Sequence, residues 1–274
     1  MHLKTGQYLS ALWRLVSRPE KSLRAIHVRF HDNKYWRGYV REKHGFPNGL
    51  PQVDILGLFP DFRETVSPYA FLEGSSLPVD LALLKALARH SKECDYFEIG
   101  RWRGESTANV AQVARSCTSM SLSDEDMRRI GFNKSEREQD GFFSKSLDNV
   151  THIQADSQTY DFSKLGNKFD LIFVDGDHHK AAITSDTANV FTLLKDENSV
   201  IVWHDYGESP ERVRWAVLAG ILDGCPEQFK KNLYHVSNTL CAVYMPGKFA
   251  TRETVFPATP DKRFSLEIKA ETIK

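Results

Sequence analysis

The clearest structural signal in this sequence is FDLIFV, residues 169–174, a mostly apolar run that leads directly into Asp175. A short run of this composition predicts a strand with both faces buried. Similar strands alternate with helical segments on either side of it, which predicts a doubly wound α/β fold with a mostly parallel sheet. The expected strands cover residues 95–99, 118–122, 150–155 and 199–203, and the expected helices cover 77–90, 105–115 and 181–194.

The segments around this core divide the chain into three expected parts. Residues 1–78 form a basic helical extension and linker, residues 79–247 the main domain, and residues 248–274 a C-terminal tail. Glycines and prolines interrupt residues 44–78, which is typical of an irregular covering segment. Near the end of the main domain, two apolar runs flank Ser237-Asn238 and predict an antiparallel edge of the Rossmann-like sheet.

The composition is that of a globular protein. The 274 residues are 41% apolar and 26% charged, and 36 basic residues balance 36 acidic ones. This balance leaves no global positive field to hold nucleic acid. The longest apolar run, residues 216–222, is far shorter than the roughly 20 residues that cross a bilayer. The four cysteines are scattered without a Cys-x-x-Cys pair, so we expect a reduced, cytoplasmic setting.

Positive charge is concentrated near the beginning of the chain, where residues 1–45 carry ten Lys or Arg and three acids. Leu9, Leu12, Trp13 and Val16 fall on one face of an expected helix. Two interpretations stay open. The favoured one is a helix packed against its own domain. The other is peripheral contact with an anionic membrane surface or docking of a partner, which includes assembly into a homo-oligomer.

Polar groups follow each expected parallel strand. In doubly wound folds, ligands bind at the carboxyl ends of the strands, near the point where the strand order reverses. The sequence therefore predicts a functional site at this edge of the sheet. Its candidate segments are residues 100–106, 121–124, 156–157, 175–179 and 204–205.

The loop after the first of these strands excludes two common phosphate-binding motifs. Its glycines, Gly100 and Gly104, are spaced Gly-x-x-x-Gly. Trp102 stands where a dinucleotide fingerprint requires glycine, and a P-loop would require glycine and lysine where Ile99 and Glu105 stand. A glycine turn preceded by an acid instead suits a ligand with a cationic amino acid part.

With these residues the sequence resembles the class I S-adenosylmethionine-dependent methyltransferases. Glu98-x-Gly100-x-x-x-Gly104-x-Ser106 is similar to their first motif. IFVDGDH at residues 172–178 and SVIVWHDY at residues 199–206 resemble the later strands of one branch. That branch holds the metal-dependent O-methyltransferases that act on sugars, macrolide sugars and catechol-like substrates. The resemblance covers residues 80–246.

The resemblance implies S-adenosylmethionine as cofactor. The glycine loop would line its methionine end, and the residues after the third strand would approach the adenine. The family usually places an acid for the ribose hydroxyls at the end of the second strand, where this chain has Ser121. Either Asp124, three residues later, reaches back to replace that acid, or the ribose is held more weakly. The implied cofactor-binding residues are Glu98, Gly100, Trp102, Gly104, Ser106, Ser121, Asp156, Ser157 and Asp175.

Methyl transfer to oxygen requires a hydroxyl that is oriented in line with the methyl–sulfur bond and that is deprotonated. The resemblance implies a divalent cation that polarises this hydroxyl, Mg²⁺ or alternatively Mn²⁺. Its implied ligands are Asp175, Asp205 and His204, although imidazole is less typical for Mg²⁺ than for Mn²⁺ or Zn²⁺. His178 is the implied general base, because an ordinary imidazole accepts a proton near neutral pH. His179 is its rival.

The expected function is therefore O-methylation of a hydroxyl on a sugar, glycan or polyhydroxylated natural product, with a small-molecule or glycan acceptor as partner. Nucleic acid is not expected as a substrate, since the site segments contain no Asn-Pro-Pro-Tyr-like motif for a flipped base. Three alternatives stay open: a metal-independent methyltransferase, a catalytically degenerate protein that binds a cofactor or a partner, and an enzyme of this fold with another nucleotide.

Overall fold

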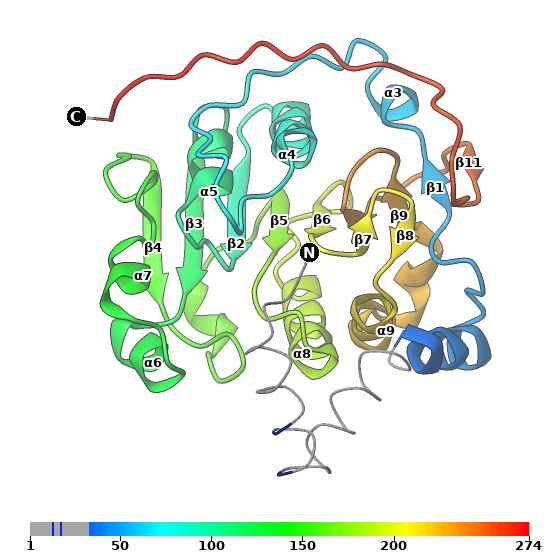
Figure 1. Ribbon diagram of the computed structural model, residues 1–274, viewed down its shortest axis with the longest axis horizontal. Helices are drawn as coiled ribbons and strands as arrows, with labels where there is room; N and C mark the ends of the chain where they lie inside the picture. The colour runs from blue at the N-terminus through cyan, green and yellow to red at the C-terminus, as the bar shows by residue number, and fades with distance from the viewer. Residues whose placement is uncertain (1–12, 14–16, 18–32, 274) are drawn as a thin grey trace.

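The strands form one large sheet in the order β11-β1-β9-β10-β6-β5-β2-β3-β4 in the computed structural model, which describes residues 13, 17 and 33–273 (Figure 1). Strands β4, β3, β2, β5 and β6 are parallel, and β10 runs antiparallel between β6 and β9. The prediction of a mostly parallel, doubly wound sheet with an antiparallel edge is confirmed. The strands are β1 (Gln52–Val53), β2 (Asp95–Ile99), β3 (Ser116–Ser121), β4 (Val150–Gln154), β5 (Leu171–Val174), β6 (Val200–Trp203), β9 (Leu233–Val236), β10 (Ala242–Tyr244) and β11 (Thr251–Arg252), with β7 (Gly207–Ser209) and β8 (Arg212–Val213) in a separate hairpin.

Strand β5 lies in the middle of the parallel part, as its sequence predicts. All residues of β5 and of its neighbour β2 are buried, because helices cover both faces of the sheet. The two strands pair in register from Tyr96 opposite Leu171 to Ile99 opposite Val174. The chain continues from β2 to β3 on one side and from β5 to β6 on the other. The strand order therefore reverses between β2 and β5, whose carboxyl ends flank the crevice where ligands bind in this fold.

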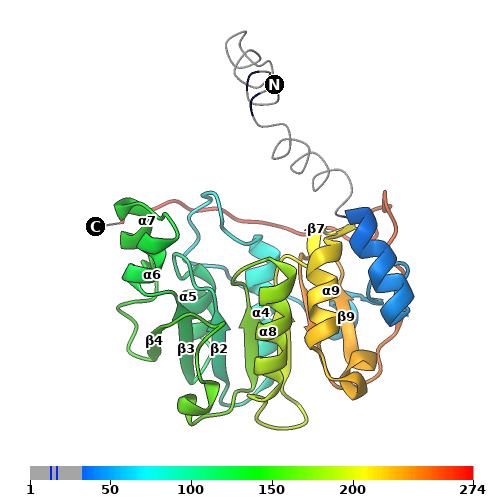
Figure 2. The ribbon, with the colours of Figure 1, turned by 90° about the horizontal axis from the view of Figure 1, so that it is seen from below.

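The helices form a layer on each face of the sheet. In Figure 2, α8 (Lys180–Phe191), α9 (Trp215–Gly224) and a helix over residues 33–44 lie in front of the sheet, and α4 (Pro78–His90) lies behind it. Helix α5 ends at Ala111 rather than at residue 115, because the chain turns to bring the Arg115 N–H to the Cys94 carbonyl at 2.8 Å. No helix within residues 33–273 has the length and apolarity needed to cross a bilayer. The remaining helices within residues 33–273 are α3 (Ile55–Leu58), α5 (Glu105–Ala111), α6 (Asp124–Arg129) and α7 (Lys134–Glu138), with two short 3-10 helices, η1 (Phe162–Leu165) and η2 (Glu227–Asn232).

Both flanking segments contribute to the folded body. Strand β1 comes from the expected linker and β11 from the expected tail, and they pair antiparallel at the far edge of the sheet. In the helix over residues 33–44, Val40 is fully buried and the Tyr39 hydroxyl donates to Asp223 on α9 at 2.8 Å. The predicted amphipathic stripe, with Leu9, Leu12 and Val16, lies outside the described residues.

Candidate active site

The loops after β2 and β5 touch at the switch point. Gly100 has a φ of 93°, and a Cβ atom there would lie 2.1 Å from the carbonyl oxygen of Asp175. The Asp175 N–H donates to the Ile99 carbonyl at 2.8 Å. Glycine is therefore required at residue 100 by the backbone of the neighbouring loop.

A segment after α7 covers the other end of the glycine loop. The Gly141 N–H donates to the Trp102 carbonyl at 2.7 Å, and a Cβ atom at Gly104 would lie 2.3 Å from the Ser144 hydroxyl. Trp102 itself has a φ of 42°, and its indole ring meets Phe132 edge-on at 6.0 Å. Gly104 thus faces protein, while Trp102 turns the loop between its two glycines.

Glu98 lies directly beneath this loop and is completely buried. The hydroxyls of Ser106 and Thr107 each donate to its carboxylate at 2.5 Å, and the Tyr96 hydroxyl donates at 3.1 Å. Burial raises the pKa of Glu98 to about 7 against the effect of these donors. Glu98 and Ser106, both predicted cofactor contacts, are bonded to each other in the structure and support the loop from below.

The end of β3 has a carboxylate that sequence reasoning missed. The Ser121 hydroxyl donates to Asp140 at 2.8 Å, and Arg101 donates to the same carboxylate at 2.5 Å. Asp124, expected to reach back toward Ser121, is instead exposed and paired with Arg137 at 2.7 Å. The suggestion that Asp124 replaces the strand-end acid is therefore wrong. Asp140 takes that position from a segment that follows α7, so no spacing within the strand motif could reveal it.

The end of β4 brings Asp156 and Ser157 to the same edge of the sheet. The Asp156 carboxylate accepts the Gln158 N–H at 2.9 Å, which closes a tight turn. The Gln158 side chain then donates to Ser157 at 3.2 Å and to the buried Asp186 of α8 at 2.9 Å. The predicted adenine-side residues are thus fixed by a polar network that joins this turn to α8.

Two strand ends converge on an acid and histidine cluster. One ligand atom from each of Asp175, His204 and Asp205 lies within 4.8 Å of the others. His204 Nδ1 is 3.2 Å from an Asp175 oxygen and 3.7 Å from an Asp205 oxygen. Strands β5 and β6 pair in parallel with Val174 opposite Trp203, which sets the following residues side by side. The three predicted metal ligands are therefore brought together.

His204 is held from behind by Asp80 of α4, a residue that sequence reasoning missed. Asp80 is fully buried, and its carboxylate bonds His204 Nε2 at 3.0 Å and the Leu240 N–H at 3.0 Å. Burial lowers the pKa of His204, but the charges and hydrogen bonds of the surrounding acids, Asp175 foremost, raise it well above the ordinary value. The pattern Leu77-Pro78-x-Asp80 indicates only the start of a helix, so no local motif predicts this contact.

His178 and Arg214 complete the surroundings of Asp205. His178 Nδ1 lies 3.2 Å and an Arg214 guanidinium nitrogen 3.1 Å from Asp205 oxygens. Burial raises the pKa of Asp205, yet His204, His178 and Arg214 together hold it below its ordinary value. His179, the rival base, is turned toward Asp177 at 2.5 Å and is 88% exposed. Of the two histidines, only His178 belongs to the cluster.

A comparison with protein families decides what kind of domain holds this cluster. Residues 97–206 match the family model described as a methyltransferase domain. The chain carries a methyltransferase domain. The predicted class, a class I S-adenosylmethionine-dependent methyltransferase, is confirmed for this segment, which runs from β2 through the residues after β6 and contains Gly100, Asp175 and His204.

Several solved structures match the chain at low sequence identity. A putative O-methyltransferase from Klebsiella pneumoniae is 15% identical over 64% of this chain and 84% of that chain, with a TM-score of 0.45. An O-methyltransferase from Bacillus cereus in complex with SAH is 14% identical over 77% of this chain and 97% of that one, with a TM-score of 0.44. Likenesses at these scores assign neither acceptor nor metal. No curated protein matches the sequence.

Proposed function

We propose that this methyltransferase transfers the methyl group of S-adenosylmethionine to a hydroxyl of a sugar, glycan or polyhydroxylated natural product, with the assistance of a divalent cation. The observation that carries this proposal is the cluster of Asp175, His204 and Asp205 beside His178. The cluster lies at the carboxyl ends of β5 and β6, next to the switch point where the glycine loop after β2 begins.

The polar groups at this edge suit the cofactor chemically. Asp140, Asp156 and Asp175 present partly exposed carboxylates near the carboxyl ends of β3, β4 and β5, at one edge of the sheet. S-adenosylmethionine offers three matching donor groups: its ammonium, its ribose hydroxyls and its adenine amino group. In addition, the Trp102 indole N–H is buried without a hydrogen-bond partner among the described residues. These residues would hold the cofactor so that its activated methyl group is presented to an oxygen.

The acid and histidine cluster also suits a divalent cation. When neutral His204 carries its proton on Nε2 and donates it to Asp80, the Nδ1 lone pair faces Asp175 and Asp205. A carboxylate behind a histidine in this way is the usual support for a metal ligand. One imidazole with two carboxylates favours Mn²⁺ over Mg²⁺. A cation bound here would polarise the acceptor hydroxyl and lower the cost of its deprotonation.

His178 is placed to receive the proton of the acceptor hydroxyl. Asp205 lies next to its Nδ1, which favours the tautomer with hydrogen on Nδ1 and leaves Nε2 free to accept a proton. When an acceptor oxygen bonds to the methyl carbon of bound S-adenosylmethionine, Nε2 of His178 would take the proton of that oxygen, and sulfur would keep the electrons of the broken carbon–sulfur bond. Arg214 keeps Asp205 charged throughout, so that His178 stays oriented.

One observation favours a metal-independent form of the same reaction as a second candidate. As an imidazolium, His204 contacts three carboxylates, those of Asp80, Asp175 and Asp205. Together with Arg214 at Asp205, it offsets part of their negative charge without a bound metal ion. In that case His178, with Asp205 behind it, acts as an unassisted base.

The experiment uses the full chain in two steps. Calorimetry with S-adenosylhomocysteine tests the cofactor, and transfer of labelled methyl to a panel of sugars is then measured with EDTA and after restoring Mn²⁺ or Mg²⁺. We expect binding, loss of turnover in EDTA and recovery with Mn²⁺. Asp205→Asn should lose turnover with little change in cofactor affinity, whereas Asp177→Asn serves as the matched control. Absence of binding would refute the cofactor, and full turnover in EDTA would select the metal-independent candidate.

We also propose a cytoplasmic setting for this enzyme. Its cysteines, Cys94, Cys117, Cys225 and Cys241, are all free and buried, which suits a reducing compartment. Peripheral membrane contact through the basic amino-terminal segment and assembly into a homo-oligomer stay proposals, which vesicle co-sedimentation and light scattering would test.

A further inference from the structure

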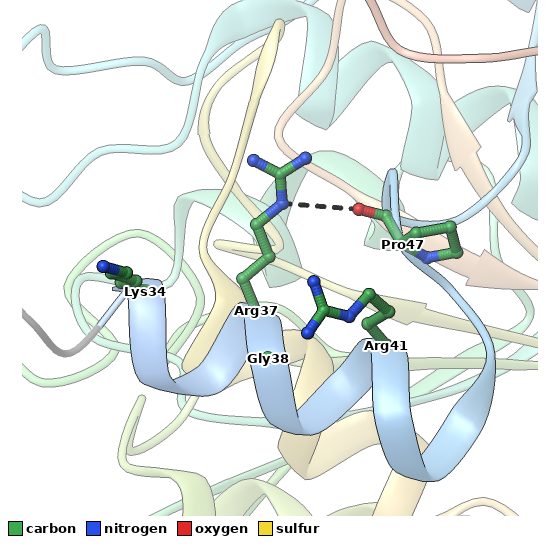
Figure 3. A pocket seen from close by; sticks show the side chains of 5 residues that line it. All are labelled: Lys34, Arg37, Gly38, Arg41 and Pro47. Atoms are coloured by element: carbon green, nitrogen blue, oxygen red, sulfur yellow. Dashed lines mark hydrogen bonds between the residues drawn. The ribbon is translucent and has the colours of Figure 1, made fainter.

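A positively charged cavity lies on the helix over residues 33–44 and includes no residue of the glycine loop. This basic pocket measures about 320 Å³ and is lined by Lys34, Arg37, Gly38, Arg41 and Pro47. Figure 3 shows Arg37 and Arg41 projecting from the same side of the helix, with Arg37 bonded to the Pro47 carbonyl. The lining therefore gathers three cationic side chains on one helix face, because residues three, four and seven apart share a face.

The charges of this pocket are poorly neutralised within the part of the chain that the structure describes. Arg37 donates its Nε to the Pro47 carbonyl at 3.4 Å, an uncharged partner. Arg41 pairs with Glu42 at 2.8 Å, but both side chains are mainly exposed, so water screens this pair. None of the lining residues is acidic. Such a cavity attracts an anion, and guanidinium groups match the geometry of phosphate oxygens.

The basic pocket is connected to the candidate active site through α9. The Arg37 guanidinium lies over the Trp215 ring, 5.3 Å from its centre, and both side chains line a second cavity of about 180 Å³, which Glu211 also lines. Trp215 follows Arg214, whose guanidinium contacts Asp205 in the acid and histidine cluster. A molecule that fills both cavities would therefore reach Trp215, the neighbour of Arg214 in the chain.

We propose that the basic pocket binds a phosphate or pyrophosphate group carried by the methyl acceptor. This inference rests on the proposed O-methylation and narrows its substrate class to phosphorylated sugars or glycans. Arg37 and Arg41 bind the phosphoryl oxygens, and Trp215 lies between this anchor and the reacting hydroxyl. The phosphate belongs either to a soluble sugar phosphate or to a lipid-linked one, since both carry the same anion.

The test measures binding without catalysis, so that it is independent of the proposed reaction. Calorimetry with inorganic pyrophosphate is run on the full chain, on Arg37→Gln/Arg41→Gln, and on Lys164→Gln/Lys168→Gln as a control with the same loss of charge. Both pairs are exposed, so the folds should persist, which circular dichroism checks. We expect pyrophosphate to bind the wild type and the control, and to bind the Arg37/Arg41 variant roughly tenfold or more weakly.

Two further measurements distinguish a soluble from a lipid-linked phosphate and show which part of the proposal fails. Co-sedimentation with phosphatidylglycerol vesicles, against phosphatidylcholine vesicles, supports a lipid-linked acceptor if it requires Arg37 and Arg41 and pyrophosphate competes. Vesicle binding without pyrophosphate binding would overturn the pocket in favour of diffuse attraction to an anionic surface. Equal pyrophosphate binding by all three proteins, or none, would also overturn it. If S-adenosylhomocysteine fails to bind while pyrophosphate binds as expected, the proposed reaction fails and the anion site stands.

Discussion

His178 and His179 are neighbours in the sequence but face different partners, Asp205 and Asp177. Replacing His178 by Ala should lower kcat by about 10²- to 10⁴-fold, because a positioned base is removed. Replacing His179 by Ala should leave kcat close to the wild type. Steady-state kinetics over a range of pH would check both, and the His178 variant should recover partly at high pH, where solvent removes the proton. Equal losses in the two variants would contradict the assignment of the base.

Glu98 provides a prediction about stability. Its pKa in the folded protein, about 7, is above the ordinary value of 4.5, so the folded state binds its proton more tightly than the unfolded state. The contribution to stability is full below pH 4.5 and is lost as the pH rises through 7. The free energy of unfolding, measured in urea, should therefore fall relative to that of Glu98→Gln by up to about 3 kcal/mol over this window. Parallel pH curves for the two proteins would show that Glu98 titrates normally.

Among the loops, the contact between the ends of β2 and β5 is the least tolerant of change. In Gly100→Ala the new Cβ atom would clash with the Asp175 backbone, whereas Gly166, also at positive φ, has open space around it. Gly166→Ala should cost about 1–2 kcal/mol for its backbone conformation alone. Gly100→Ala should cost about 1–3 kcal/mol more, because the loops must separate. Urea unfolding measures both, and S-adenosylhomocysteine affinity should fall only in the Gly100 variant.

The elements show what a single sequence can predict. Strands β2, β4, β5 and β6 and helices α4 and α8 follow from apolar patterns that are local, so their positions agree with the structure to within a few residues. Strands β1 and β11 could not be predicted, because two residues each are too few for a pattern and they exist only through pairing with one another and β9.

The same difference applies to the candidate site. Asp175, His178, His204 and Asp205 follow predicted strands, so topology alone places them together. Contacts from Asp80, Asp140 and Arg214 arise on a helix and on loops whose placement depends on tertiary packing. The sequence therefore predicts the groups that reach the crevice, and the groups that hold them in place become visible only in the folded chain.

At the scale of the whole molecule, Asp223 of α9 links the helix over residues 33–44 to α8 and α9. Its carboxylate accepts from Tyr39, Lys43 and His44 of that helix and pairs with Lys180 of α8. These donors hold the pKa of Asp223 well below its ordinary range despite burial. Asp223→Ala should lower the free energy of unfolding by about 1–3 kcal/mol near neutral pH. The difference from the wild type should shrink as acid protonates Asp223, because a lowered pKa stabilises only above the unfolded value.

Deletion of residues 1–45 tests the same connection. Val40 of the helix over residues 33–44 lies in the core between the sheet and α9. Loss of a buried aliphatic residue together with its helix should lower Tm clearly, measured by calorimetry, and should weaken S-adenosylhomocysteine binding through reduced stability. An unchanged Tm would mean that this helix adds no stability to the domain.

The contact between Asp80 and His204 has a consequence for ligand affinity. Asp80 is fixed by α4 and by the Leu240 amide, so the imidazole of His204 is held in one orientation by the protein alone. A side chain that is free to rotate loses conformational entropy when a ligand immobilises it, at a cost of about 0.5–1.5 kcal/mol. Here folding has already ordered the ring. The site is preorganised at His204, so an ion or molecule that binds there does not lose binding free energy to the ordering of this side chain.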